Sequence, residues 1–156
     1  MRIQICAVSR LRRGPEKDLF DDYVARFDKI GRALSLGPIE LIEVEDRSGG
    51  RADVEGERLL KAVRENAHIC ALDERGTLRS SPDLATHMAR LRDDGTSTLS
   101  FVIGGADGLS KDVRQAAQEA LSFGKMVWPH ALARVMLAEE IYRAGTILAG
   151  SPYHRA

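Results

Sequence analysis

The hydrophobic pattern alternates between short apolar runs and longer stretches with helical spacing. The apolar runs cover residues 2–8, 38–44, 67–73 and 98–103, and their lengths and β-branched residues are typical of strands. The stretches between them repeat apolar residues every three or four positions, which predicts amphipathic helices. The runs at 67–73 and 98–103 are apolar at almost every position, as expected for strands covered on both faces. The pattern therefore predicts an α/β fold with a mostly parallel sheet flanked by helices.

Turn and capping residues mark the ends of the predicted helices. Pro15 suits the first turn of a first helix, and the helical pattern returns at Asp53. A third helix is expected with Ser81 as its cap, Pro82 at its first position and Gly95 as its end. These three helices fall between successive apolar runs, as a parallel sheet requires.

The chain after residue 103 predicts two further helices around a short strand. A helix is expected to begin after Ser110 and to stop at Gly124, a strand to cover 125–128, and a last helix to run over 131–144. The apolar positions of the helix after Ser110 are Val113, Ala116, Ala117, Ala120 and Leu121. The last helix is apolar on more than one side, so it is either sandwiched in the core or also in contact with a second subunit.

The composition is that of one ordinary domain, spanning residues 1–156. Hydrophobic residues make up 44% and charged residues 29% of the chain, with 23 basic against 23 acidic side chains. A net charge of zero argues against binding naked nucleic acid through bulk charge, because such binding rests on many phosphate contacts. No apolar run approaches the roughly 20 residues of a membrane helix, and the N-terminus lacks a signal peptide pattern. We therefore expect a cytoplasmic protein without a membrane partner.

Two cysteines, Cys6 and Cys70, lie inside apolar runs without Cys-x-x-Cys spacing. They are expected to be buried free thiols, and a strained or redox-active pair is the alternative. Neither a His-x-x-x-His pair nor a Cys/His cluster is present, so no metal site is predicted. His68 and His87 fall within predicted elements and are expected to be structural. His130 follows a proline at a helix start, where it is expected to cap the helix or contact a ligand.

Glycines between the run ending at Ile103 and the next helix form the first candidate site. In open α/β sheets ligands lie beyond the carboxyl ends of strands, and Gly104, Gly105 and Gly108 would let a ligand approach the backbone. The segment is not a Gly-x-Gly-x-x-Gly fingerprint, and no Lys-Ser/Thr pair follows it. A tight turn without a ligand is the alternative.

Cationic and aromatic residues at the C-terminus form the second candidate site. Tyr153 is suited to stacking on a base, His154 to moving a proton near neutral pH and Arg155 to holding an anionic group. A frayed tail without a function is the alternative. The loop at 10–13 carries three further arginines, which form a second cationic point. A solvated charge cluster is the alternative.

Several segments taken together are similar to those of a known family. They are Val102-Ile103-Gly104-Gly105-x-x-Gly108-Leu109, Leu121-Ser122-Phe123, Pro129-His130, Arg134-Val135, Glu139-x-x-Tyr142-Arg143-Ala144 and Tyr153-His154-Arg155. The combination resembles the ribosomal large-subunit pseudouridine N3-methyltransferases, the RlmH family of the SPOUT methyltransferases. The match covers the full length, and Asp107 and Trp128 differ from the residues more usual in that family.

The resemblance implies a homodimer with a trefoil knot in its C-terminal half. It also implies methylation by S-adenosylmethionine of N3 of a pseudouridine (position 1915) in the 23S rRNA of the assembled ribosome. The implied cofactor contacts are Leu72, Gly104, Phe123, Gly124, Lys125, Met126, Val127 and Trp128. The implied catalytic residues are Tyr153, His154 and Arg155, with His154 as base or Arg155 stabilising the deprotonated ring.

Two other functions fit the same residues. One is a non-catalytic factor that binds the ribosome or assists its assembly with the same fold. The other is an α/β enzyme that binds a phosphorylated metabolite at Gly104-Gly105 and the helix that follows.

Overall fold

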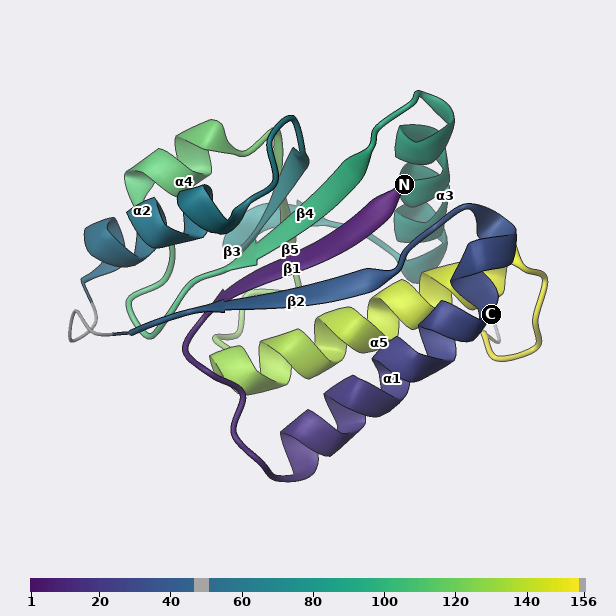
Figure 1. The fold of residues 1–156 in the computed structure, drawn as a ribbon, viewed down its shortest axis with the longest axis horizontal. Helices are drawn as coiled ribbons and strands as arrows, with labels where there is room; N and C mark the ends of the chain where they lie inside the picture. Colours follow the sequence, from purple (N-terminus) through teal and green to yellow (C-terminus); the bar gives the residue numbers. More distant parts are fainter. Residues whose placement is uncertain (47–50, 155–156) are drawn as a thin grey trace.

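A computed structural model of the chain describes residues 1–46 and 51–154. Within those residues five strands form one sheet in the order β2-β1-β4-β3-β5 (Figure 1). The strands are β1 (Arg2–Val8), β2 (Ile39–Val44), β3 (His68–Leu78), β4 (Thr98–Ile103) and β5 (Glu119–Ser122). The helices are α1 (Pro15–Gly31), the 3₁₀ turn η1 (Arg32–Leu34), α2 (Ala52–Ala62), α3 (Ser81–Asp93), α4 (Lys111–Ala116) and α5 (His130–Leu148).

The ladders between these strands are all parallel, which confirms the predicted α/β class. Ile5 of β1, for example, lies between Leu41 of β2 and Phe101 of β4. Parallel strands place their carboxyl ends at the same edge of the sheet, and the loops that leave this edge are where α/β proteins hold ligands.

Alternate residues of each strand face two separate cores. On β1, Ile3 and Ile5 face the core built with α1, α3 and α5, whereas Cys6 and Val8 face the core under α2 and α4. Figure 1 shows α2 and α4 on one side of the sheet and α1 and α5 on the other. Both faces are covered, so the continuous apolar runs have the expected explanation.

α5 is sandwiched inside its layer, the first of the two expected arrangements. It packs against α1, α3 and β4, and Ala133, Leu137, Ala138 and Ile141 are buried on different sides of it. Leu132 remains 40% exposed, so α5 also keeps an apolar position on the surface.

The expected helix from Ser110 to Gly124 is wrong beyond Ala116. α4 ends at Ala116, and the chain continues as β5, which pairs with β3 over Cys70–Glu119, Ala71–Ala120 and Leu72–Leu121. Alanine-rich spacing favours a helix locally, but without β5 the edge of β3 would keep unpaired backbone groups. The fifth strand is therefore at 119–122. Residues 125–128, expected to be that strand, form a loop.

Other element boundaries also differ from expectation. α5 continues to Leu148, four residues beyond the expected end at 144. The cap of α3 is Ser80 rather than Ser81, because the Ser80 hydroxyl accepts from the Asp83 N–H while the Asp83 side chain accepts from the Ser80 N–H. β3 runs on to Leu78 instead of ending at residue 73, through an irregular segment described below.

Both thiols are buried and free, as expected. Burial, with a smaller effect of Glu40, raises the pKa of Cys6 to about 12. In the described ranges no helix is long and apolar enough to cross a membrane.

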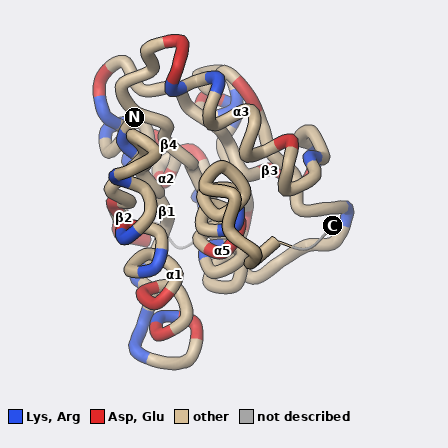
Figure 2. The backbone as a smooth tube through the Cα atoms, turned by 90° about the vertical axis from the view of Figure 1, so that its right-hand side faces the viewer, with Lys and Arg blue, Asp and Glu red and all other residues tan. Residues whose placement is uncertain are grey.

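Charged residues of both signs occur along the whole length of the chain. In the view of Figure 2, basic and acidic residues are interspersed along the chain. Several form pairs one helical turn apart, such as Lys17–Asp21 and Lys61–Glu57. Basic and acidic positions are thus mixed along the backbone seen in this view.

Candidate active site

A cavity of about 680 Å³ lies at the carboxyl edge of the sheet. Its size is within the range of small-molecule sites in proteins. Apolar side chains from β3, β4 and β5 contribute to its walls, and loops after those strands supply the rest. The lining residues are Leu72, Asp73, Glu74, Arg75, Ile103 through Leu109, Arg114, Leu121, Phe123, Gly124, Met126 through His130, and Ala133.

The glycine turn after β4 forms one wall and is folded tightly on itself. The N–H of Gly108 donates to the carbonyl of Gly105 over 3.1 Å. A Cβ on Gly104 would lie only 2.5 Å from the backbone carbonyl of Gly108, and Gly108 itself has φ +75°. Side chains at Gly104 and Gly108 would therefore open or strain the turn, which leaves backbone rather than side chains facing the cavity.

An irregular segment of β3 forms the opposite wall. Both Leu72 and Thr77 are opposite Leu121 of β5, so residues 73–76 leave the ladder. Gly76 permits this path, because a Cβ there would lie 2.7 Å from the backbone of Ala120. The bulge carries residues 73–75 into the lining of the cavity.

The loop from Phe123 to Pro129 covers the cavity and is anchored at its start. The Ser122 hydroxyl accepts from the Gly124 N–H and lies 3.1 Å from the Glu74 carbonyl, which joins the loop to the β3 bulge. Gly124 has φ +113°, a conformation that favours glycine. Met126 is 70% and Val127 83% exposed, so this covering loop presents apolar side chains to solvent.

α5 begins at the cavity, where a buried arginine fixes it to the sheet. The Arg134 guanidinium donates to the carbonyls of Val8 and Ser9 and to Glu43, at 2.9 to 3.0 Å. This holds His130, one turn earlier, in the cavity wall. Burial and the charge of Arg134 lower the pKa of His130, and Asp46 opposes them. The lowered pKa favours the neutral form of the His130 imidazole.

Charges of both signs line the mouth of the cavity. Asp73, Glu74 and Asp107 are acidic, and Arg75 and Arg114 are basic. Arg114 lies 3.9 Å from Asp73 and also donates to the Leu109 carbonyl. The cations are thus balanced by neighbouring carboxylates, unlike the cationic clusters that hold phosphate groups.

Comparison with known proteins reveals close relatives of full length. A family described as "Predicted SPOUT methyltransferase" matches residues 1–154. This chain belongs to the SPOUT methyltransferases. A protein of Dinoroseobacter shibae named ribosomal RNA large subunit methyltransferase H is 59% identical over 155 residues, covering 99% of both chains. The protein of the same name from Ruegeria sp. (strain TM1040) is 57% identical with the same coverage.

The resemblance drawn from the sequence is confirmed by these matches. Among solved structures, a probable methylase family protein from Haemophilus influenzae Rd KW20 has a TM-score of 0.52 at 13% identity. The match covers 99% of this chain and 70% of that protein. At that identity the likeness extends to the fold alone.

Most of the cofactor residues expected for this SPOUT methyltransferase meet at the cavity. Leu72, Gly104, Phe123, Gly124, Met126, Val127 and Trp128 all belong to its lining. Lys125 does not, and its side chain is exposed. The two residues unusual for the family, Asp107 and Trp128, both line the cavity.

Tyr153 and His154 do not line this cavity. The Tyr153 hydroxyl donates to Glu139 over 2.9 Å, and its ring packs against Tyr142 and beneath the Arg143 guanidinium. Burial first, then the bond to Glu139, raises the pKa of Tyr153 well above its ordinary value. His154 Nδ1 is buried without a hydrogen-bond partner. Arg155 lies outside the described residues.

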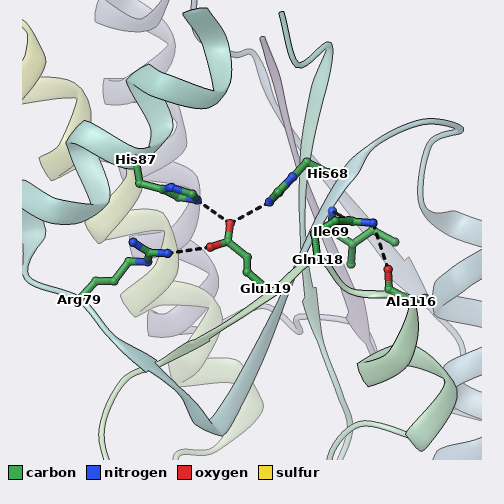
Figure 3. Close-up of polar contacts among 7 residues, drawn as sticks. All are labelled: His68, Ile69, Arg79, His87, Ala116, Gln118 and Glu119. Atoms are coloured by element: carbon green, nitrogen blue, oxygen red, sulfur yellow. Dashed lines mark hydrogen bonds and ion pairs between the residues drawn. The ribbon is translucent and has the colours of Figure 1, made fainter. Parts of the chain in front are cut away.

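His68 and His87 belong to a polar cluster outside the lining of the cavity (Figure 3). Their Nε2 atoms lie 3.0 and 2.6 Å from one oxygen of Glu119, and Arg79 donates to its other oxygen over 2.9 Å. Although burial opposes it, the bonds from His87 and His68 lower the pKa of Glu119. The cluster joins β3, α3 and β5, which agrees with a structural role for both histidines.

Within the described ranges, His68, His87 and Glu119 each offer one atom that could bind a metal ion. These atoms all lie within 4.8 Å of one another. Both oxygens of Glu119 already have hydrogen-bond partners. The His87 nitrogen also lies closer to the Glu119 oxygen than the roughly 3.3 Å between two ligand atoms of a tetrahedral zinc with bonds near 2.0 Å. The cluster is therefore complete as an ion-pair network. The absence of a metal from this protein stays a prediction.

Sequence reasoning missed the polar residues of the cavity mouth. Asp73, Glu74 and Arg75 reach it through the β3 bulge, and Arg114 reaches it from α4. The one local signal was Gly76, three residues after the end of a strand-like run, because a glycine near strand residues often marks a bulge.

Proposed function

We propose that this protein methylates N3 of a pseudouridine in large-subunit ribosomal RNA, with S-adenosylmethionine as the methyl donor. The observation that carries the proposal is a cavity of about 680 Å³ at the glycine turn, in a chain that belongs to the SPOUT methyltransferases. The names of the full-length relatives support the ribosomal RNA substrate.

The residues of the cavity fit S-adenosylmethionine. Backbone at Gly104 and Gly108 and apolar walls at Leu72, Ile103 and Leu121 suit an adenosine held by apolar contact and backbone hydrogen bonds. The balanced charges at the mouth suit a ligand that carries both charge signs and no phosphate. A phosphorylated metabolite is disfavoured for the same reason.

Methyl transfer is an in-line displacement, so the protein must mainly position its reactants. Bound S-adenosylmethionine supplies a methyl group on a sulfonium sulfur. As the new N3–carbon bond forms and the sulfur–carbon bond breaks, N3 must lose its proton. Tyr153, His154 and Arg155 are the groups that we propose for the target nucleotide, with His154 or Arg155 handling that proton or the resulting charge.

We propose that the active protein is a homodimer in which the tail of one subunit serves the cavity of the other. Tyr153 is attached to Glu139, which lies nine residues after His130 on α5, about 14 Å along the helix axis. Figure 1 likewise shows that the chain leaves α5 at the far end of the helix from its first turn. The exposed apolar side chains of Met126, Val127 and Leu132 support an interface beside the cavity.

A neutral, mixed surface supports an assembled ribosomal particle as the substrate. Without an excess of basic residues, affinity has to come from a shaped site rather than from general attraction to phosphates. This substrate would also place the protein in the cytoplasm. Family membership supports a trefoil knot in the C-terminal half, which we include in the proposal.

Ligand-dependent stability tests the cofactor. S-Adenosylmethionine at a hundred times its dissociation constant should add about 2.7 kcal/mol to the free energy of unfolding. For a chain of this length, that raises the melting temperature by roughly 5–10 °C. ATP at the same concentration should leave it unchanged. A shift with ATP and none with S-adenosylmethionine would support the phosphorylated metabolite instead.

A further inference from the structure

α2 carries a carboxyl group for which the proposed reaction has no use. Glu55 is only 1% exposed. Both of its oxygens are buried without a well-formed hydrogen bond, although the Gly105 N–H and the Asp46 carboxyl group lie beside them. An ionised carboxylate in such a place costs far more free energy than a neutral one. Buried polar groups are almost always satisfied, so an exception in a native protein requires an explanation.

The Glu55 carboxyl lies directly against the glycine turn. A Cβ on Gly105 would be 2.8 Å from one of its oxygens and 3.1 Å from the other. Gly105 also lines the cavity. One glycine therefore contacts both the carboxyl group and the space proposed for the cofactor, and a displacement of the carboxyl group would move the cavity wall.

The next residue fixes the position of α2 against the other end of the same turn. A Cβ on Gly56 would lie 2.1 Å from Ser110 Oγ, and Ser110 caps α4 by accepting from the Val113 N–H. The backbone of α2 at Gly56 thus packs tightly against the side chain that caps α4. This contact leaves Glu55 little freedom to withdraw from Gly105.

The charged groups around Glu55 oppose its ionisation. Burial raises the pKa of Glu55 most, and the carboxyl groups of Asp46 and Asp107 raise it further, against a smaller effect of the Gly105 N–H. The neighbouring cations are engaged elsewhere: Arg58 donates to the Glu45 carbonyl and Arg51 pairs with Asp53. Ionisation would place the negative charge of Glu55 near that of Asp107, which is itself part of the turn.

We propose that Glu55 is a positioning residue for the cofactor cavity, and that its uncharged carboxyl group holds the Gly104–Gly108 turn in the shape that accepts the cofactor. The inference rests on the proposed function, since it concerns the affinity for S-adenosylmethionine. In the ionised form, repulsion from Asp107 and the demand for water displace Gly105 and weaken binding.

The proposal fixes the sign of the pH dependence. The cofactor binds the protonated form of Glu55 more tightly, so its affinity is full below the raised pKa of Glu55 and is lost as the pH rises through it. Above that pKa the dissociation constant increases by up to about tenfold for each pH unit. Glu55→Gln keeps the shape of the uncharged group and cannot ionise, so this increase disappears.

The experiment is a calorimetric titration of S-adenosylmethionine into the full-length protein from pH 5.5 to 9. Wild type, Glu55→Gln and the control Glu57→Gln are compared; Glu57 is exposed on the same helix and pairs with Lys61. The cofactor's own amino group titrates equally in all three, so the difference between their curves is the measure. We expect Glu57→Gln to follow the wild type and Glu55→Gln to retain affinity at high pH.

Equal pH dependence in wild type and Glu55→Gln would overturn the inference while leaving the proposed function intact. No binding to the wild type at any pH would overturn both. If Glu55→Gln does not fold, proton uptake on binding to the wild type, from titrations in buffers of different ionisation enthalpy, decides instead. Uptake that grows with pH supports the proposal, and its absence contradicts it.

Discussion

Arg134 has no exposed surface, and its guanidinium joins α5 to the last residues of β1 and β2. Four groups accept its hydrogen bonds: the carbonyls of Val8, Ser9 and His130, and the Glu43 carboxylate. Because Glu43 also accepts from the Leu11 N–H, one ion pair fixes both the loop after β1 and the start of the last helix. His130 is positioned in the cavity wall as a consequence.

Replacing Arg134 tests this connection. Arg134→Met keeps most of the apolar volume but leaves the carbonyls and Glu43 without their partner, so the free energy of unfolding should fall by about 3–5 kcal/mol. Urea denaturation measures it. Arg26→Met is the matched control, because the Arg26–Asp22 pair is about half exposed on α1 and should contribute under about 1 kcal/mol. Equal losses for both variants would contradict the structural role of Arg134.

The loops at the carboxyl edge depend on glycines that local pattern indicated only in part. The turn after β4 was a candidate site because Gly104, Gly105 and Gly108 follow an apolar run. The bulge in β3 was not predicted, since the run of strand-like residues stops at 73 and the charged residues after it are typical of a loop. Only the register with β5 keeps residues 77 and 78 in the sheet.

The α4–β5 segment shows why local pattern was insufficient there. Val113 to Leu121 follows helical spacing, but its last residues complete the edge of β3, which begins about 50 positions earlier in the chain. A partner so distant in sequence is invisible to a local pattern. By contrast, β1, β4 and α1 were predicted within a residue, because burial on both faces and the Pro15 start determine them locally.

Gly104→Ala tests the glycine turn as a unit. The new Cβ would meet the Gly108 backbone at 2.5 Å, so the turn must open. The affinity for S-adenosylmethionine should fall at least about tenfold, a loss of about 1.4 kcal/mol of binding free energy. Calorimetric titration measures it, with Gly95→Ala as the control.

Gly95 has φ +86° at the end of α3, so alanine there costs folding stability but should not change the affinity. Unchanged affinity in Gly104→Ala would exclude a tightly packed cofactor at this turn.

In the whole molecule the cavity lies at the start of α5, whereas Tyr153 lies against the middle of that helix. Every loop that lines the cavity comes from the carboxyl edge of the sheet, whereas Tyr153 is bound to the middle of α5. No periodicity in the sequence could have predicted this separation, because it depends on how the chain returns along α5 after residue 148.

Subunit mixing tests whether the site is shared between two chains. Gly104→Ala should inactivate the cavity, and a His154→Ala, Arg155→Ala double variant should inactivate the tail. Each homodimer is then inactive, but a mixed dimer keeps one site with an intact cavity and an intact tail. Mixing them under exchange conditions should restore about a quarter of the wild-type methyl transfer, since half the dimers are mixed and each has one of two sites. No recovery, with exchange verified by mass, would place the tail and cavity of one chain together.

Methyl transfer to ribosomal particles is the most direct test of the proposed function. Labelled S-adenosylmethionine and the protein are incubated with ribosomes that lack the modification, and the labelled nucleoside in the large-subunit RNA is identified by mass spectrometry. We predict one methyl group per particle, on N3 of a single pseudouridine, with little transfer to protein-free RNA. No incorporation would favour a non-catalytic ribosome-binding factor, and a methyl group on another atom or nucleotide would contradict the proposed reaction.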